Sequence, residues 1–452
     1  MTATLHYAAQ HRRNHLDELI TFLRIPSIST LPEHNPDMLA AAEWLVRAMA
    51  DAGLDHARTI ATDGHPLVYA DWLHAGPDAP TVLIYGHYDV QPVDPLTLWQ
   101  TPPFEPTIRD DFLYARGAAD DKGQVYVHVK AAEAYLRTEG RLPVNVKFIV
   151  EGEEEIGSAN LNAFISHNHE LLRADSALIS DSSMLAPGQP ALVYGLRGNC
   201  HLLVDITGPA QDLHSGSYGG GVNNPLNALA HLIARLKDER GHILIPGFYD
   251  RVTPLSLEER ELLSHIPLDE EAWRLEAGAP ALWGEPEYSL IERISARPTL
   301  DVTGLIGGYT GEGTKTVLPA HAHAKISMRL VPDQSPAEIV ALFEEYVRAV
   351  LPPSVDVRIR VASLSPAALL DRESAPMRAA AAALEATFHR PPVFMREGGS
   401  IPVVSRFDRE LGLPTVLMGF GLPDDRIHSP NERFFLPNFF CRIETSIHYL
   451  DL

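Results

Sequence analysis

The sequence predicts an α/β protein in which a large, mainly parallel sheet flanked by helices is interrupted by a smaller α+β domain. Strand-like apolar runs alternate with helical periodicity in the first part of the chain, and alternating strands appear in the middle. The length of 452 residues exceeds the roughly 50–250 residues of an ordinary domain, so two domains are expected.

The first part of the chain predicts the sheet. Its expected elements, in order, are a helix over 39–52, a strand over 81–85, a helix over 123–137 and strands over 144–150 and 176–180. Such alternation favours parallel strands with helices on both faces. Ligands bind beyond the carboxyl ends of such strands, where His87, Glu154 with Glu155, and Asp181 stand.

The middle predicts the second domain. Residues 202–206 and 324–330 alternate as half-exposed antiparallel strands do, and helical patterns cover 224–237 and 335–350. A strand over 415–418 and a helix from Pro437 return to the first pattern. We therefore expect one domain over residues 1–197 and 363–452, and an inserted domain over 198–362.

Composition excludes several partners. The chain has 59 Asp and Glu against 37 Lys and Arg, a formal charge of −22, which argues against nucleic acid and anionic membrane surfaces. No run of about 20 apolar residues exists, and residues 1–24 read as an amphipathic helix rather than a signal peptide. Cys200 and Cys441 are expected to be free, buried thiols, and the protein is expected in the cytoplasm.

Five short segments carry the chemistry. They are Gly86–Asp89, Ala119–Gly123, Glu151–Gly157, Ser180–Asp181 and His428–Glu432. Imidazole and carboxylate suit Zn²⁺, Mn²⁺ and Co²⁺. Two such ions activate a water and polarise a scissile carbonyl, while a carboxylate that is not a ligand moves the proton. Asp89, two residues after His87, is placed to orient the imidazole.

Each segment alone has a structural explanation. The pair Asp120 and Asp121 suits a helix N-terminus, and so does Asp181 before two serines. The run Glu153–Glu155 suits a solvated turn, and His428 suits a loop. The metal site is favoured because these segments occur in combination.

At these residues the sequence resembles the di-metal peptidase family of carnosine dipeptidases, cytosolic non-specific dipeptidases, aminoacylases and succinyl-diaminopimelate desuccinylases. The resemblance runs from Ile25–Ser29 to His428–Glu432 and is greatest for the carnosine and non-specific dipeptidases. The segments that carry it are Arg116–Gly123, Tyr194–Gly198, Asp212–Gly216, Lys315–Pro319 and Arg396–Pro402.

The resemblance implies a ligand set. His87 and Asp181 would bind one metal ion, Glu155 and His428 would bind the other, and the Asp120 carboxylate would bridge both. The peptide bond between Asp120 and Asp121 would be cis, as in relatives. The resemblance thus implies two divalent ions per subunit, with Zn²⁺ expected first and Mn²⁺ as the alternative.

The same resemblance implies the catalytic groups. Glu154 would be the general base and Asp89 would orient His87. Relatives carry two adjacent glutamates, whereas three stand in a row here, Glu153 included. Counting back from Gly157 assigns Glu154 and Glu155.

The inserted domain would be a lid that also forms a homodimer. His214 would reach the partner's site and stabilise the oxyanion, so it is both a catalytic and a substrate-binding candidate. Arg329 would grip the substrate's C-terminal carboxylate through its bidentate fork. Thr316 and Ser400 would be further substrate contacts.

Three functions stay open at this point. The first is a dipeptidase or short-peptide exopeptidase acting on small peptides. The second is an N-acyl-amino-acid or carbamoyl amidohydrolase with the same metal site, since both substrates offer an amide beside a carboxylate. The third is a binding protein on the same scaffold.

Overall fold

The computed structural model describes residues 1–451, which fold as two compact units. The first unit comprises Met1–Tyr194, Leu370–Met395 and Val403–Leu452, and the second comprises Gly195–Leu369 and Arg396–Pro402. Residues 195–197, 363–369 and 396–402 were expected in the first domain, whereas all three segments belong to the second unit. Strand β14, Asp356–Ser365, crosses the expected boundary at residue 363 and explains part of the difference.

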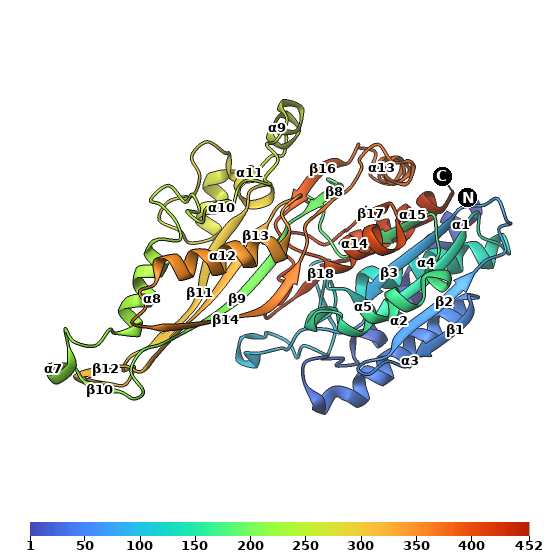
Figure 1. Cartoon of the computed structure of the whole chain (residues 1–452). Helices are drawn as coiled ribbons and strands as arrows, with labels where there is room; N and C mark the ends of the chain where they lie inside the picture. The colour runs from blue at the N-terminus through green and yellow to red at the C-terminus, as the bar shows by residue number, and fades with distance from the viewer. Residues whose placement is uncertain (452) are drawn as a thin grey trace. The chain divides into compact units, whose positions relative to one another are not determined.

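A sheet with a parallel centre organises the first unit (Figure 1). Its strands are β1 (Asp55–Ile60), β2 (Leu67–Trp72), β3 (Thr81–His87), β6 (Asn145–Glu151), β7 (Ser176–Ile179), β8 (Ala191–Leu196), β16 (Val393–Glu397) and β17 (Thr415–Leu417). The order is β1-β2-β6-β3-β7-β17-β8, with β16 beside β8. Strands β6, β3, β7 and β17 run parallel, and antiparallel strands flank them. The mainly parallel α/β sheet expected from the sequence is confirmed.

Helices cover this sheet. They are α1 (Thr2–Gln10), α2 (Arg12–Leu23), α3 (Asn35–Ala52), α4 (Lys122–Thr138), α5 (Ala159–His167), α6 (His169–Leu172), α13 (Ala375–Phe388), α14 (Pro402–Arg406) and α15 (Leu436–Asp451). Short helical turns are η1 (Pro32–His34), η2 (Leu96–Leu98), η3 (Glu154–Ile156) and η4 (Phe407–Leu411). The single N-terminal helix expected over residues 1–24 is two helices that meet at His11.

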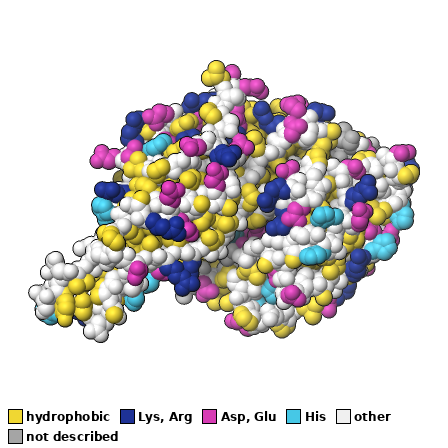
Figure 2. Space-filling model, viewed as in Figure 1, with side chains coloured by type: hydrophobic (Ala, Val, Ile, Leu, Met, Phe, Trp, Pro, Cys, Tyr) yellow, Lys and Arg dark blue, Asp and Glu magenta, His cyan; other side chains and the backbone are white. Residues whose placement is uncertain are grey.

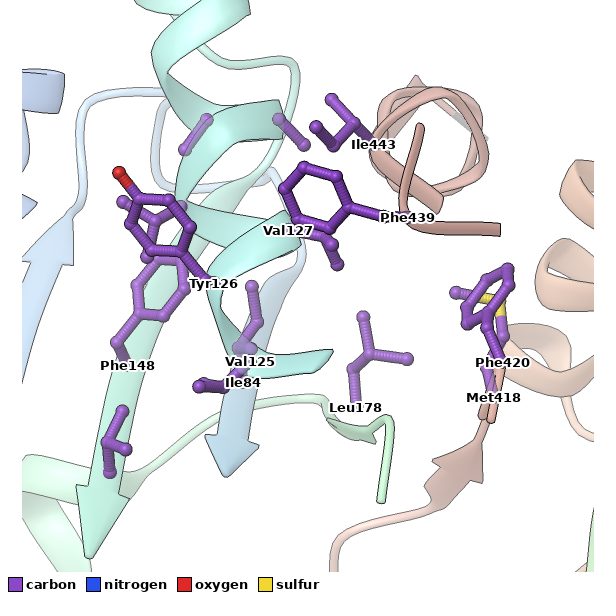
Figure 3. Packing of buried hydrophobic residues seen from close by; sticks show 14 of the residues in the cluster. Ile84, Val125, Tyr126, Val127, Phe148, Leu178, Met418, Phe420, Phe439 and Ile443 are labelled. Carbon is purple, nitrogen blue, oxygen red and sulfur yellow. The ribbon is translucent and has the colours of Figure 1, made fainter. Parts of the chain in front are cut away.

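The core lies between the sheet and helices α3, α4 and α15. Ile84 of β3, Phe148 of β6 and Leu178 of β7 point to this side and pack with Val127 and Phe439 (Figure 3). Side chains alternate along a strand, so Tyr85 points to the other face, where its ring meets the edge of Phe407. Both faces of the parallel strands are therefore buried, which explains their continuous apolar runs.

A small sheet joins two distant segments of the first unit. It consists of β4 (Thr107–Arg109), β5 (Phe112–Tyr114) and β18 (Arg433–Phe435), with β5 in the middle. Arg433 pairs with Tyr114, so the residue before β18, Glu432, lies beside the residue after β5, Ala115. This sheet was not expected from the sequence, because its strands are only three residues long.

The second unit is an antiparallel sheet with helices on one face. Its elements are β9 (Gly198–Thr207), β10 (Leu213–His214), α7 (Ser215–Tyr218), α8 (Pro225–Ala234), α9 (Leu257–Ser264), α10 (Glu270–Glu276), α11 (Leu290–Ser295), β11 (Thr299–Gly307), β12 (Val317–Leu318), β13 (His321–Leu330), α12 (Pro336–Val350), β14 and β15 (Ala368–Leu369). The strand order is β11-β13-β9-β14, and α8 and α12 pack on one side with Leu202 and Ile326 in the core.

The second unit is the α+β domain that the sequence predicts, but with four strands instead of two. Edge strands β11 and β14 were missed because most of their side chains are polar or exposed. Cys200 is buried and Cys441 is only partly buried, and both are free, so the expectation of two buried thiols holds for Cys200 alone. Among residues 1–451, no helix combines the length and apolarity that a membrane span requires.

Candidate metal centre

Asp120 lies at the centre of the candidate site, with one carboxylate oxygen facing each of two histidines. Its Oδ1 is 3.1 Å from His87 Nε2, and its Oδ2 is 2.8 Å from His428 Nε2. Asp181 Oδ2 lies 3.9 Å from His87 Nε2, and Glu155 Oε2 lies 3.3 Å from His428 Nε2. The five side chains form two groups that share Asp120, with ligand atoms within 4.8 Å of one another in each group.

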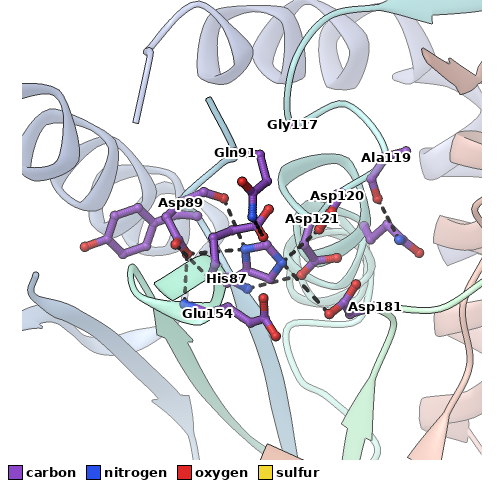
Figure 4. Close-up of polar contacts among 12 residues, drawn as sticks. His87, Asp89, Gln91, Gly117, Ala119, Asp120, Asp121, Glu154 and Asp181 are labelled. Carbon is purple, nitrogen blue, oxygen red and sulfur yellow. Dashed lines mark hydrogen bonds and ion pairs between the residues drawn. The ribbon is translucent and has the colours of Figure 1, made fainter. Parts of the chain in front are cut away.

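The sheet brings these side chains together at the carboxyl ends of its parallel strands (Figure 4). His87 is the last residue of β3 and pairs with Glu151, the last residue of β6. The turn η3, three residues later, carries Glu155, and Asp181 follows β7. Asp120 stands two residues before α4. Adjacent parallel strands end at one edge, so the clustering follows from the topology.

Asp89 ties His87 to the turn η3. His87 Nδ1 lies 3.3 Å from the carboxylate Oδ1 of Asp89 and 3.1 Å from its backbone oxygen. The same carboxylate accepts the backbone N–H groups of Glu154 and Glu155, at 3.3 and 3.1 Å. A proton held on Nδ1 leaves Nε2 with a lone pair directed at Asp120 and Asp181, which is the tautomer that a metal ligand requires.

The three adjacent glutamates have different surroundings. Glu153 accepts hydrogen bonds from the backbone N–H of His65 at 2.9 Å and from Asn160, so it anchors a loop and lies in neither ligand group. Glu155 faces His428, and Gln91 donates to its Oε2 at 2.6 Å. Glu154 belongs to neither group, yet it lies beside His87 and Asp181 (Figure 4). Glu154 and Glu155 thus occupy the positions that the count back from Gly157 assigns to the base and the ligand.

The helix-cap explanation of the aspartate pair does not hold. Asp121 occupies the N-cap position of α4, but its side chain makes no capping hydrogen bond. Its Oδ2 accepts the backbone N–H of His87 at 3.1 Å. The bond between Asp120 and Asp121 is cis. A Cβ on Gly86 would lie 2.6 Å from Asp121 Oδ2, so only glycine fits there.

Burial and mutual repulsion shape the ionisation of the site. Burial and the neighbouring Asp120 raise the pKa of Asp181 to about 7. Burial likewise raises the pKa of Glu154 well above its usual value. Hydrogen bonds to Asp120 and Glu155 raise the pKa of His428 to about 10. A cluster with more carboxylates than imidazoles is stabilised by added positive charge.

The residues present fit two divalent cations. His87, Asp120 and Asp181 offer one nitrogen and two carboxylates, and Asp120, Glu155 and His428 offer the same set. Glu155 Oε1 is buried without a hydrogen-bond partner among the described residues, and so is available to a cation. Nitrogen and carboxylate oxygen are the donors that Zn²⁺ and Mn²⁺ accept.

The other predicted site residues lie in the second unit, in two separate places. His214 ends β10, is exposed, and accepts the backbone N–H of Gly216 at 3.0 Å. Thr316 lies next to it, since its carbonyl accepts the N–H of Ser215. Arg329, near the other end of β13, donates to Ser400 Oγ at 3.0 Å. The structure therefore pairs His214 with Thr316 and Arg329 with Ser400.

Comparison with known proteins places this arrangement in a family. Residues 83–451 match the model of peptidase family M20/M25/M40. The chain belongs to this family. It is 32% identical over 452 residues to a Beta-Ala-His dipeptidase of Homo sapiens, covering 95% of this chain and 89% of the relative. It is 32% identical over 455 residues to a Cys-Gly metallodipeptidase of Candida albicans, covering 96% and 93%.

Solved structures agree. Human carnosine dipeptidase 1 superimposes with a TM-score of 0.85 at 29% identity, over 99% of this chain and 97% of that one. An M20 family metallo-carboxypeptidase from Sulfolobus solfataricus gives a TM-score of 0.88 at 34% identity, over 97% and 98%. The resemblance to di-metal peptidases and the expectation of a metal-dependent hydrolase are confirmed.

Sequence reasoning missed a carboxylate that supports the M20 site. Glu432 is fully buried. It accepts hydrogen bonds from Arg116 Nη1 at 2.8 Å and from the backbone N–H groups of Gly117, Ala119 and Asp120 at 2.9, 2.9 and 3.1 Å. Glu432 and Arg116 both stand in segments noted in the sequence, but 316 positions separate them. No sequence signal pairs them.

Proposed function

We propose that this M20 peptidase hydrolyses the peptide bond of dipeptides or short peptides at a site formed by His87, Asp120, Glu155, Asp181 and His428. The observation that carries the proposal is the placement of Asp120, whose two oxygens face two separate nitrogen-containing ligand groups. The dipeptidase relatives over nearly the full chain support it.

The cofactor in this proposal is a pair of divalent ions in each subunit, Zn²⁺ first and Mn²⁺ as the alternative. When bound, they would lower the pKa of a water and polarise the scissile carbonyl. His87, Asp120 and Asp181 would hold one ion, and Asp120, Glu155 and His428 the other. Nitrogen and oxygen donors in this ratio suit both metals.

Glu154 is the proposed general base. Its carboxylate lies near His87 and Asp181 but belongs to neither ligand group, so it is free to take a proton from water and to pass it to the leaving amine. Burial raises its pKa, which brings the carboxylate closer to the proton affinity needed for both steps. Asp89 would act by keeping His87 in the required tautomer.

Arg329, Ser400, His214 and Thr316 are proposed substrate contacts. Arg329 would bind the substrate's C-terminal carboxylate, and its hydrogen bond to Ser400 fixes the guanidinium. His214 would donate to the oxyanion that develops on the scissile carbonyl, with a contribution of about 3 kcal/mol to the barrier. Thr316 lies beside His214 and would bind the same part of the substrate.

The distance between His214 and Arg329 supports a homodimer. His321 begins β13 at the end near His214, and Arg329 stands eight positions later. Eight positions span about 26 Å at about 3.3 Å per residue. A dipeptide extends only about 7 Å. A dipeptide held by Arg329 is therefore out of reach of His214 of the same chain, so His214 would act in the partner's site.

The second unit carries surfaces suited to such a dimer. Hydrophobic side chains gather on the projecting tip that β10, α7 and β12 form (Figure 2), where Tyr218 is exposed. Leu305 and Ile306 on edge strand β11 are exposed as well. An edge strand with exposed apolar side chains is typical of an interface. The second unit is accordingly the proposed lid and dimerisation domain.

The proposed compartment is the cytoplasm. Both cysteines are free, as expected where disulfides are rare. The formal charge of −22 makes nucleic acid and anionic membrane surfaces poor partners. The proposed partners are a small peptide substrate and a second copy of the chain.

Hydrolysis of an unblocked dipeptide and of its N-acetylated form tests the function. Protein loaded with Zn²⁺ or Mn²⁺ should release amine from the unblocked form, and Glu154→Ala should not. Faster cleavage of the acetylated form would instead identify an N-acyl-amino-acid amidohydrolase with the same metal site.

Mixing two inactive variants tests the dimer. His214→Ala and Glu154→Ala should each be inactive, but subunit exchange should restore activity because each hybrid dimer has one site with both residues intact. If exchange is verified by labelled subunits and no activity returns, His214 does not act in the partner's site.

A further inference from the structure

A cavity beside Arg329 is lined by more positive charge than one substrate carboxylate would neutralise. It has a volume of ≈ 380 Å³ and lies entirely within the second unit. Residues of β11, β13 and α11 line it, together with residues of the loop around Trp283. The volume lies within the about 300–1,000 Å³ of small-molecule sites, and so leaves room for an amino-acid residue.

The charges that line the cavity do not balance. Five basic and two acidic side chains line it, for a formal charge of +3, in a chain whose total is −22. Two of the basic side chains have acidic partners. Lys237 lies 3.4 Å from Asp301, and Arg297 makes two hydrogen bonds to Glu285, at 2.7 and 3.0 Å.

The other three basic side chains, Arg197, Arg293 and Arg329, make no ion pair with any residue in the described part of the chain. Arg197 donates to the backbone oxygens of Gly398 and Arg297, at 3.1 and 3.2 Å. Arg293 donates through Nε to the backbone oxygen of Tyr288 at 2.7 Å. Each guanidinium has five N–H donors, so donors remain in all three.

Hydrogen bonds to backbone oxygens hold Arg197 and Arg293 in place, and Arg329 donates to Ser400 Oγ. Arg197 is fixed by two carbonyls, and Gly398 leaves room for it, since a Cβ there would lie 2.6 Å from Arg197 Nη2. Burial and the neighbouring Arg329 lower the pKa of Arg197 to about 10. Close, partly buried like charges are costly, and a bound carboxylate relieves that cost through charge-assisted hydrogen bonds.

We infer that this cavity binds a second carboxylate, and that the preferred substrates are dipeptides whose C-terminal residue is aspartate or glutamate. The inference rests on the proposed function, in which Arg329 binds the C-terminal carboxylate. That carboxylate carries one negative charge, so Arg197 and Arg293 remain for the acidic side chain. Lys237 and Trp283 also line the cavity, with Lys237 Nζ 4.8 Å from the centre of the Trp283 ring.

Hydrolysis of Ala-Glu and Ala-Gln by metal-loaded protein tests the inference, because the two side chains have the same shape and differ in charge. The expected kcat/KM is at least about tenfold higher for Ala-Glu, equivalent to about 1.4 kcal/mol. Equal values, or a preference for Ala-Gln, would overturn the inference while leaving the dipeptidase function in place.

Substitutions at Arg293 locate the effect. Arg293→Ala should bring the ratio of the two kcat/KM values toward one, and Arg293→Lys, which keeps the charge, should restore part of it. Arg251→Ala is the matched control, because Arg251 is an exposed arginine of the same unit that does not line the cavity. If Arg293→Ala leaves the ratio of the two kcat/KM values unchanged, the preference for an acidic side chain does not arise in this cavity. That result would refute the cavity as the site of the second carboxylate.

Binding of the free amino acids separates the cavity from the catalytic function. Calorimetric titration of the metal-loaded protein should show tighter binding of L-glutamate than of L-glutamine, and Arg293→Ala should reduce the difference. This result without turnover of either dipeptide would support the cavity and contradict the dipeptidase function. Equal binding of the two amino acids would contradict the cavity. If Arg293 variants fail to fold, the comparison on the unsubstituted protein decides alone.

Discussion

Replacing Glu432 by glutamine should destabilise the first unit and weaken metal binding together. The carboxylate of Glu432 accepts four hydrogen bonds, two at each oxygen, from Arg116 and from the backbone N–H groups of Gly117, Ala119 and Asp120. A glutamine keeps only one accepting oxygen, so its amide N–H₂ would face two donors. Glutamine has nearly the same size as glutamate, so the expected loss of stability comes from the missing charge and acceptor rather than from packing.

The magnitude follows from the contacts. Removing one partner of a buried ion pair costs about 3–5 kcal/mol, and each buried donor left unpaired costs about 1–3 kcal/mol. These costs overlap at Glu432, so we expect a loss of about 3–5 kcal/mol in the free energy of unfolding. The backbone of Asp120 loses one of its anchors, and supporting residues of this kind change metal affinity by about 10–100-fold.

Urea unfolding of the metal-free protein and calorimetric titration with Zn²⁺ measure the two effects separately. Glu385→Gln on the exposed side of α13 is the matched control and should change neither quantity. Unchanged unfolding free energy and unchanged metal affinity in Glu432→Gln would show that the Glu432 contacts do not position Asp120.

Three further outcomes are expected. Glu154→Ala should reduce kcat by about 10²–10⁴-fold while elemental analysis still finds bound metal, because Glu154 lies outside both ligand groups. Arg329→Ala should lower kcat/KM for dipeptides by about tenfold or more, since it removes a charge-assisted hydrogen bond of about 1.5–3 kcal/mol; unchanged steady-state kinetics would refute the clamp. His128 is buried between Ser180 and Ser446, and burial lowers its pKa from 6.5 to about 3. The unfolded chain therefore binds one more proton between these pH values, so stability falls as pH drops, by about 2 kcal/mol from pH 6.5 to 5; His128→Gln should flatten that slope in urea unfolding.

The centre of the fold was predictable because its signals are local. The apolar run of β3 ends at Gly86 and His87, and the run of β7 ends just before Asp181. Once these runs are parallel strands, the topology brings the polar residues to one edge. The metal ligands, taken from the family resemblance, come together in the structure.

The remaining features depend on contacts between distant residues. The pairing of Arg116 with Glu432 spans 316 positions, and the strands that bring them together are three residues long. Edge strand β14 carries mostly exposed side chains, so hydrophobic periodicity barely marks it. Segment 396–402 belongs to the second unit because Ser400 bonds to Arg329 and Arg197, which no local pattern reveals.

Metal stoichiometry measured together with activity tests whether the site that Asp120 centres holds two catalytic metal ions. Chelated protein is titrated with Zn²⁺ or Mn²⁺, and bound metal per chain and dipeptide hydrolysis are followed in the same samples, with Asp120→Asn in parallel. We expect two bound ions per chain at full activity, no activity without metal, and loss of both binding and activity in Asp120→Asn. Full activity in the chelated protein, or with a single ion per chain, would contradict the two-metal site.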